Sequence, residues 1–171
     1  IMIFALAYSA GPYPLSHHGL GDIAVVIFFG FIPVTFTCFL QTGTWENMDV
    51  IMPTSAAVGL LAANVLIVNN YRDMEDDAAV GKRTTVVIFG RRFMSMVYLL
   101  SGIIGMVAMI PVWRRLPLWA SAVPAIYIIL HIKSWKALRN AQGAGLNPLL
   151  GRTAVNLLVF AALFLLASLM N

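Results

Sequence analysis

The chain has 171 residues, of which 60% are hydrophobic and 11% are charged. A soluble domain has about 25% charged residues, so a soluble globule of this length could not cover its surface with so few charges. The mean hydropathy of +0.86 therefore indicates an integral membrane protein. The net charge is +4, but the sequence offers no basic patch on a soluble surface, which argues against nucleic-acid binding. The single cysteine excludes a disulfide framework.

Five stretches are predicted to be membrane-spanning helices, because a span needs about 17–25 predominantly apolar residues. They cover residues 23–40, 50–71, 93–113, 116–132 and 153–170. Residues 1–8 are apolar but too short to span, and are predicted to be the last two turns of a sixth helix that begins upstream. The sequence thus predicts an all-α integral membrane protein, with residues 1–171 forming a single transmembrane domain.

The connections between these spans differ in charge. Residues 72–92 and 133–152 are predicted as two long polar loops, and they hold nine of the eleven Lys and Arg residues. The other two, Arg114 and Arg115, fall on the opposite side of the membrane. The excess of Lys and Arg in cytoplasmic loops predicts that both long loops, together with residues 9–21, face the cytoplasm.

Four of the seven acidic residues lie within five positions at the end of the second predicted span. They are Asp73, Glu75, Asp76 and Asp77, and they follow the amide pair Asn69–Asn70. If the helix continues through this segment, Asn69, Asp73, Asp76 and Asp77 share one face. Like charges at this spacing repel, and a charge near the bilayer is costly.

A divalent cation would offset this repulsion, since Mg²⁺ is held by one or two carboxylates plus substrate phosphates. Lys82 and Arg83 follow closely and could bind oxygens of the same phosphate. The pattern is typical of a site that handles a diphosphate. The alternative is a solvated helix end where acids and bases neutralise one another. The paired amides favour a site, because amides in an apolar span are costly unless they are bonded.

Two blocks of the sequence resemble a known family. The segment Asn69-Asn70-Tyr71-Arg72-Asp73-x-x-x-Asp77, followed by Gly81-Lys82-x-Thr84, resembles the second aspartate motif of the UbiA-type intramembrane prenyltransferases. Upstream, Tyr8-Ser9-x-Gly11-Pro12-x-Pro14-Leu15, Gly19-Leu20-Gly21-Asp22 and Phe28-Phe29-Gly30 are similar to the junction of helices 4 and 5 in one branch of that family, which uses 1,4-dihydroxy-2-naphthoate in menaquinone synthesis. The resemblance runs over nearly the whole chain.

This resemblance implies a bundle of nine transmembrane helices around a cavity that opens to the cytoplasm, in the cytoplasmic (inner) membrane. The chain would supply the end of helix 4 and helices 5–9, without the N-terminal half and its first aspartate motif. The implied reaction is Mg²⁺-dependent transfer of a polyprenyl group from polyprenyl diphosphate to dihydroxynaphthoate. Diphosphate and CO₂ would leave, giving demethylmenaquinol.

The resemblance also implies roles for individual residues. Mg²⁺ would be held by Asp73 and Asp77, with Asn69 facing the same site and Asn70 beside it. The diphosphate would contact Arg72 and Lys82, with Arg83 as a further candidate, and Tyr8 would line the cavity near the reacting centre. Tyr8 is otherwise explained as an interfacial tyrosine.

The chain departs from the family pattern in two respects. The family uses two aspartate motifs and only the one at Asp73–Asp77 is found here, because Asp22, Glu46 and Asp49 are isolated or lie on the opposite side. Where many relatives have a base in the loop between helices 4 and 5, this chain has His17–His18. This pair could bind phosphate or act as acid–base groups, or could simply belong to a polar interfacial loop.

Two alternatives to this function stay open. A relative of the same family could prenylate a different aromatic acceptor. A non-enzymatic transport or assembly subunit could bind a divalent ion at Asp73 and Asp77, although few polar residues lie deep in the spans. Among other polar residues, His131 is predicted to be interfacial, and Asn156 to bond to a neighbouring helix.

Overall fold

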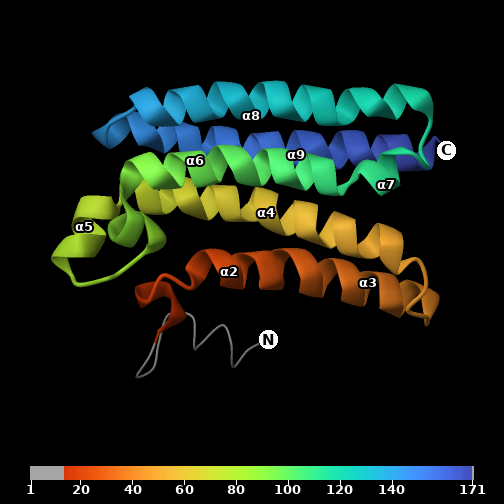
Figure 1. The fold of residues 1–171 in the computed structure, drawn as a ribbon, viewed down its shortest axis with the longest axis horizontal. Coiled ribbons are helices and arrows are strands. Elements are labelled where there is room, and N and C mark those ends of the chain that lie inside the picture. Colours follow the sequence, from red (N-terminus) through yellow and green to blue (C-terminus); the bar gives the residue numbers. More distant parts are fainter. Residues whose placement is uncertain (1–13, 171) are drawn as a thin grey trace.

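The computed structural model describes residues 14–170, and this part of the chain is helical apart from short connections (Figure 1). Its elements in chain order are η1 (Leu15–His17), α2 (Gly21–Val25), η2 (Val26–Phe31), α3 (Ile32–Thr42), α4 (Met48–Arg72), α5 (Met74–Ala79), α6 (Thr85–Ala108), α7 (Ile110–Trp113), η3 (Leu118–Ser121), α8 (Ala122–Asn140), η4 (Gly143–Leu146) and α9 (Asn147–Leu169). The prediction of an all-α protein is confirmed for these residues. The predicted short helix over residues 1–8 lies outside them.

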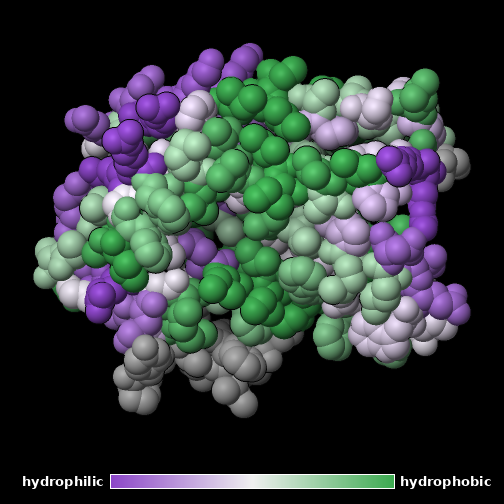
Figure 2. All heavy atoms as spheres, viewed as in Figure 1, coloured by the Kyte–Doolittle hydropathy of each residue, from purple (hydrophilic) through white to green (hydrophobic). Residues whose placement is uncertain are grey.

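Five helical segments are long and apolar enough to cross a membrane, as the hydropathy of the sequence predicts. They are Gly21–Thr42, Met48–Arg72, Thr85–Trp113, Leu118–Asn140 and Gly143–Leu169. Figure 2 shows the corresponding surface, in which hydrophobic side chains form a central zone and hydrophilic ones gather toward both ends. Since lipid offers no hydrogen-bond partners, a bundle of helices satisfies the backbone of these spans internally.

The prediction of two long polar loops, over residues 72–92 and 133–152, is wrong. Helix α8 continues to Asn140 and α9 begins at Asn147, so only residues 141–146 connect them. Lys133, Lys136 and Arg139 therefore lie on the last turns of a helix, where long side chains can reach the polar interface. The other predicted loop contains the whole of α5 and the first turns of α6.

Helix α6 is broken near its start. Gly90 has φ 78° and ψ 159°, a conformation that glycine adopts readily, and it separates a first segment from the longer span that begins at Arg91. The third span was predicted to begin at residue 93, two residues after this longer segment begins. Thr84 caps the first segment, because its hydroxyl accepts a hydrogen bond from the backbone N–H of Val87.

Helix α4 lies at the centre of the bundle. It packs against α2, η2 and α3 on one side and against α6 and α9 on the other, while α8 packs on α6 and α9 (Figure 1). The backbones come close together at Gly30 of η2 and Gly59 of α4, where an added Cβ at Gly30 would lie 2.5 Å from the Cα of Gly59. Small residues allow such close helix packing in membranes.

Two mid-span polar residues are held between helices. Asn156 of α9 donates to the hydroxyl of Ser134 on α8 at 2.8 Å, which confirms its predicted bond to a neighbouring helix. The interfacial position predicted for His131 is wrong, because its side chain is fully buried. Its Nε2 lies 2.9 Å from the carbonyl oxygen of Tyr98, and its ring occupies the space beside Gly102.

Candidate active site

The end of α4 carries a compact polar cluster of three residues. Arg72 donates from Nε to one oxygen of Asp73 at 2.6 Å and from Nη2 to the other at 2.8 Å. The same Nη2 reaches the amide oxygen of Asn69 at 2.9 Å, and the Asn69 amide nitrogen donates to Asp73 at 3.3 Å. Two of these residues, Asn69 and Asp73, are one helical turn apart, which brings them to the same face.

The helix does not continue unbroken through the acidic segment. Asp73 has φ −90° and ψ 10°, so α4 ends at Arg72 and α5 begins at Met74. The backbone N–H of Asp77 still bonds to the carbonyl of Asp73 at 2.8 Å. The prediction that Asn69, Asp73, Asp76 and Asp77 share one face of a continuous helix is therefore wrong. Asp77 still lies one helical turn beyond Asp73.

Asp77 is more buried than Asp73 or Glu75. Its side chain is about 10% exposed, and its Oδ1 accepts a hydrogen bond from Lys82 Nζ at 3.0 Å. Its Oδ2 is buried and has no hydrogen-bond partner among residues 14–170. A buried carboxylate oxygen without a donor is costly, so this atom marks a position for a cation or another donor.

A second arginine fixes the acidic segment to the rest of the bundle. Arg91 donates two hydrogen bonds of 2.7 Å to the carboxylate of Glu75 and reaches the carbonyl oxygen of Tyr71 at 3.1 Å. Because the last carbonyls of a helix have no partner within it, Arg91 stabilises the end of α4 as well as α5. Glu75 is thereby directed to Arg91 and belongs to a separate ion pair from Asp73 and Asp77.

Both ion pairs affect the charge state of their acids. The hydrogen bond from Arg72 holds the pKa of Asp73 below its usual value, and the hydrogen bond from Arg91 likewise lowers the pKa of Glu75. A bond that favours the charged form has this effect. Asp73 is therefore ionised at neutral pH, as a cation ligand has to be.

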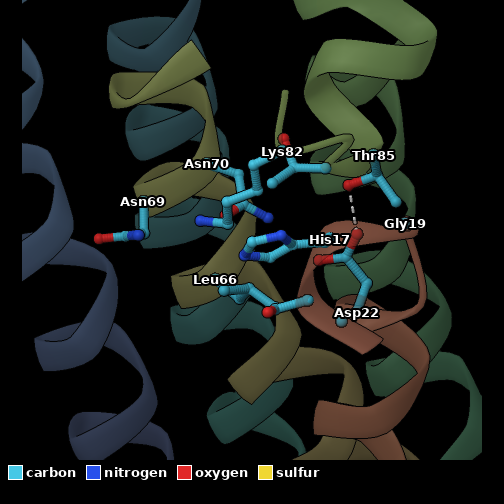
Figure 3. Close-up of a pocket in the computed structure, with 11 residues that line it drawn as sticks. His17, Gly19, Asp22, Leu66, Asn69, Asn70, Lys82 and Thr85 are labelled. Carbon is cyan, nitrogen blue, oxygen red and sulfur yellow. Dashed lines mark hydrogen bonds between the residues drawn. The ribbon is translucent and has the colours of Figure 1, made fainter. Parts of the chain in front are cut away.

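A cavity of about 470 Å³ lies beside this cluster, between the start of α2, the end of α4 and the connection into α6 (Figure 3). Its lining consists of Ser16, His17, Gly19, Gly21, Asp22, Leu66, Asn69, Asn70, Lys82, Thr84 and Thr85. In Figure 3 the side chains of His17, Asn70 and Lys82 converge on the middle of this space. The volume is within the range of roughly 300–1,000 Å³ that is typical of small-molecule sites.

One wall of the cavity was not predicted from the sequence. Asp22, in the first turn of α2, accepts a short hydrogen bond from the hydroxyl of Thr85 at the start of α6. Its other oxygen, Oδ1, is buried with no partner in the described part of the chain. The two residues are 63 positions apart, so no local pattern in the sequence could connect them.

Comparison of the sequence with known protein families identifies the family. The model of the UbiA prenyltransferase family matches residues 1–147. The chain belongs to the UbiA prenyltransferase family. The resemblance carried by the second aspartate motif is thereby confirmed.

Several curated relatives of this chain carry names that include a naphthoate or naphthoquinone. A protein of Escherichia coli (strain K12) named 1,4-dihydroxy-2-naphthoate octaprenyltransferase is 33% identical over 96% of this chain and 54% of its own length. One of the same name from Haemophilus influenzae is 43% identical, over 52% of this chain and 28% of its own. A Synechocystis protein named 2-carboxy-1,4-naphthoquinone phytyltransferase is 28% identical over 73% of this chain and 42% of its own. No solved structure matches.

The relatives that match along nearly the whole of this chain are about twice as long, so the chain spans about half of their length. UbiA prenyltransferases generally use a divalent metal, and the donors present here fit such an ion in type. Asp77 offers a buried oxygen without a partner, and Asp73 offers an ionised carboxylate. Across residues 14–170 no three His, Cys, Asp or Glu side chains gather to hold a metal by themselves. Phosphate oxygens are the ligands expected to complete such a set.

The structure separates the other predicted residues into two groups. Asn70, His17 and Lys82 line the cavity. The Nδ1 of His18 donates to the carbonyl oxygen of Pro14 at 2.8 Å instead. Arg83 contributes its backbone N–H to the carbonyl of His17 at 3.1 Å, which ties the loop before α6 to the segment before α2. Tyr8 lies outside the described residues.

Proposed function

We propose that the complete protein transfers a polyprenyl group from polyprenyl diphosphate to 1,4-dihydroxy-2-naphthoate. Diphosphate and CO₂ leave, and the product is demethylmenaquinol. The observation that carries this proposal is the arrangement at the end of α4, where two carboxylates, each paired with a cation, lie beside a polar cavity. The names of the relatives that match along nearly the whole chain support the acceptor.

Asp73 and Asp77 are proposed to hold Mg²⁺, with Asn69 as a neighbouring oxygen donor. Bound Mg²⁺ would act as a Lewis acid that stabilises negative charge on the leaving diphosphate. The residues themselves prepare this site in advance. Arg72 keeps Asp73 ionised. Two residues that line the cavity bond to the carboxylates, Asn69 to Asp73 and Lys82 to Asp77. Preorganised charges of this kind need no reorganisation when the reaction occurs.

Arg72 and Lys82 are proposed to bind the diphosphate, with Arg83 as a further contact. Arg72 uses Nε and Nη2 in its bonds to Asp73 and Asn69, and a guanidinium has five N–H donors. Its remaining donors suit phosphate oxygens. Lys82 bonds to Asp77 with one of three ammonium protons. Both cations can therefore stabilise the charge that develops as the C–O bond of the donor breaks.

The acceptor ring is proposed to attack the resulting allylic cation inside the bundle. Apolar helix walls would hold the isoprenoid tail and keep water from quenching the cation. Tyr8 would face the reacting centre, and Asn70, His17 and His18 would belong to the polar end of the substrate cavity. Of these, Asn70 and His17 already line it.

The active-site face is proposed to be cytoplasmic, in the inner membrane, because nine of the eleven Lys and Arg residues cluster toward that end. Residues 1–171 would form a single transmembrane domain, made of the end of helix 4 and helices 5–9 of a nine-helix bundle. The first aspartate motif would come from the other half of the complete protein.

A transfer assay tests this proposal. The complete protein, reconstituted in lipid, is expected to transfer a labelled polyprenyl group to dihydroxynaphthoate when Mg²⁺ is present and to stop when EDTA is added. Asp73→Asn and Asp77→Asn should each lower kcat by about 100-fold or more. Glu75→Gln is the matched control, because Glu75 lies in the same acidic segment but pairs with Arg91. Undiminished transfer by either Asn variant would contradict the proposed metal site.

A different aromatic acceptor is the second candidate. The relative from Synechocystis is named for transfer of a phytyl group to 2-carboxy-1,4-naphthoquinone, so the names of the relatives include more than one pair of substrates. Parallel assays with 4-hydroxybenzoate and with dihydroxynaphthoate distinguish the two. The absence of transfer to every aromatic acceptor would favour a non-enzymatic subunit that binds a divalent ion.

A further inference from the structure

Asp22 presents an unused hydrogen-bond acceptor at the wall of the cavity. One of its oxygens is occupied by the Thr85 hydroxyl, while Oδ1 is buried and has no partner among residues 14–170. Figure 3 shows the carboxylate on the side of α2 that faces His17, with its bond to Thr85 drawn as a dashed line. Since nearly all buried polar groups in proteins are bonded, this atom indicates a missing donor.

The chemistry of the wall restricts what this donor can be. A carboxylate oxygen repels a diphosphate, so this end of the cavity is unsuited to the anionic group of the prenyl donor. The cationic groups, Arg72 and Lys82, belong instead to the end of α4 and its connection to α6. A neutral hydroxyl group is the simplest ligand that donates to an anionic acceptor at short distance.

We infer that Asp22 Oδ1 accepts a hydrogen bond from a hydroxyl group of the aromatic acceptor, and so sets the orientation of its ring. This inference rests on the proposed function for the identity of the acceptor. In dihydroxynaphthoate the hydroxyl at carbon 1 can bond internally to the adjacent carboxylate. The hydroxyl at carbon 4 has no such neighbour, and is the one assigned to Asp22.

A purely structural role for Asp22 makes a different prediction. The bond to Thr85 joins the start of α2 to the start of α6, and its loss could loosen both helices. Asp22→Asn separates the two roles, because the amide oxygen can still accept from Thr85 while an NH₂ group replaces the free oxygen. An NH₂ group cannot accept a hydrogen bond from the acceptor hydroxyl.

The experiment measures ligand binding by the complete protein in nanodiscs, under anaerobic conditions. The probes are 1,4-dihydroxy-2-naphthoate and 1-hydroxy-2-naphthoate, which lacks the hydroxyl at carbon 4. Wild type should bind the dihydroxy compound more tightly, by about tenfold or more, as expected for a hydrogen bond to a charged group. Asp22→Asn should remove this preference and leave the affinity for the monohydroxy compound within about twofold.

Thr85→Val is the control for the structural role. It removes the tie between α2 and α6 but keeps the carboxylate, so it should retain most of the preference for the dihydroxy compound. The inference is overturned if wild type binds both probes equally, or if Asp22→Asn weakens both by the same factor. Because binding is measured without turnover, these results are independent of whether the protein transfers a prenyl group.

Discussion

Lys82 Nζ lies 3.0 Å from one oxygen of Asp77, while the other oxygen of this carboxylate is buried and has no donor among residues 14–170. The lysine therefore supplies a hydrogen bond to only one of the two carboxylate oxygens. Its amine also lines the cavity beside α4. The pair thus joins the proposed cation ligand to the proposed diphosphate site through one hydrogen bond.

Replacing Lys82 by Met is expected to lower both stability and activity. The change leaves Asp77 buried and unpaired, which should reduce the free energy of unfolding by about 1–3 kcal/mol. Unfolding of the complete protein in mixed micelles measures this loss. The double variant Lys82→Met with Asp77→Leu should recover much of the stability but no transfer activity. Recovery of activity in the double variant would show that the pair is only structural.

Gly102 is expected to be intolerant of any side chain. A Cβ at this position would lie 2.3 Å from Nε2 of His131, which is fixed by its bond to the Tyr98 carbonyl. Gly102→Ala should therefore destabilise the bundle by about 1–3 kcal/mol, as overpacking does. Gly151→Ala is the matched control, because an added Cβ there meets nothing within 4 Å. Equal unfolding midpoints for the two variants would contradict this packing.

The interior of each span could be predicted from hydropathy, but the span ends could not. Amphipathic last turns, such as those carrying Lys133 and Lys136, look like loops because their charged groups resemble a solvated segment. The first turns of α6, before Gly90, could not be predicted either. Gly90 interrupts the helix and the charged Arg91 follows it, so this segment also looks like a loop. Charged residues mark where a helix reaches the membrane–water interface, but the helix itself continues beyond that point.

The acidic cluster could be located from spacing alone, while its pairing could not. The sequence places Asp73 and Asp77 one turn apart, but only the fold shows that Arg72 binds the first and Lys82 the second. In the sequence Asp22 looks like an isolated acid, because its partner, Thr85, is 63 positions away. Tertiary contacts between helix starts have no local signature in the chain.

Arg91 is expected to matter more for stability than its acidic partner does. Glu75 is mostly exposed, and exposed ion pairs contribute little. Arg91 also bonds to the carbonyl of Tyr71 at the end of α4. Arg91→Met should therefore lower the Tm of the complete protein clearly, whereas Glu75→Gln should shift it only slightly. Thermal inactivation in lipid nanodiscs measures both, and an equal shift would assign the effect to the ion pair alone.

The pH dependence of activity is expected to change when Arg72 is replaced. Because Arg72 lowers the pKa of Asp73, the carboxylate stays charged at pH values below its ordinary pKa and loses its charge only as the pH falls through the lowered pKa. In Arg72→Gln this pKa should rise toward the ordinary value of an aspartate. The acid limb of kcat/KM should then move to higher pH, in addition to any loss of diphosphate binding.

Glu75→Gln is the control for this shift, because it removes an acid whose pKa is lowered by a different arginine, Arg91. Its acid limb should coincide with that of wild type, since Glu75 is directed away from Asp73 and Asp77. Steady-state transfer rates from about pH 2 to pH 7, at saturating Mg²⁺, measure all three profiles. A lower rate for Arg72→Gln with an unmoved acid limb would show that Arg72 binds substrate without controlling the charge of Asp73.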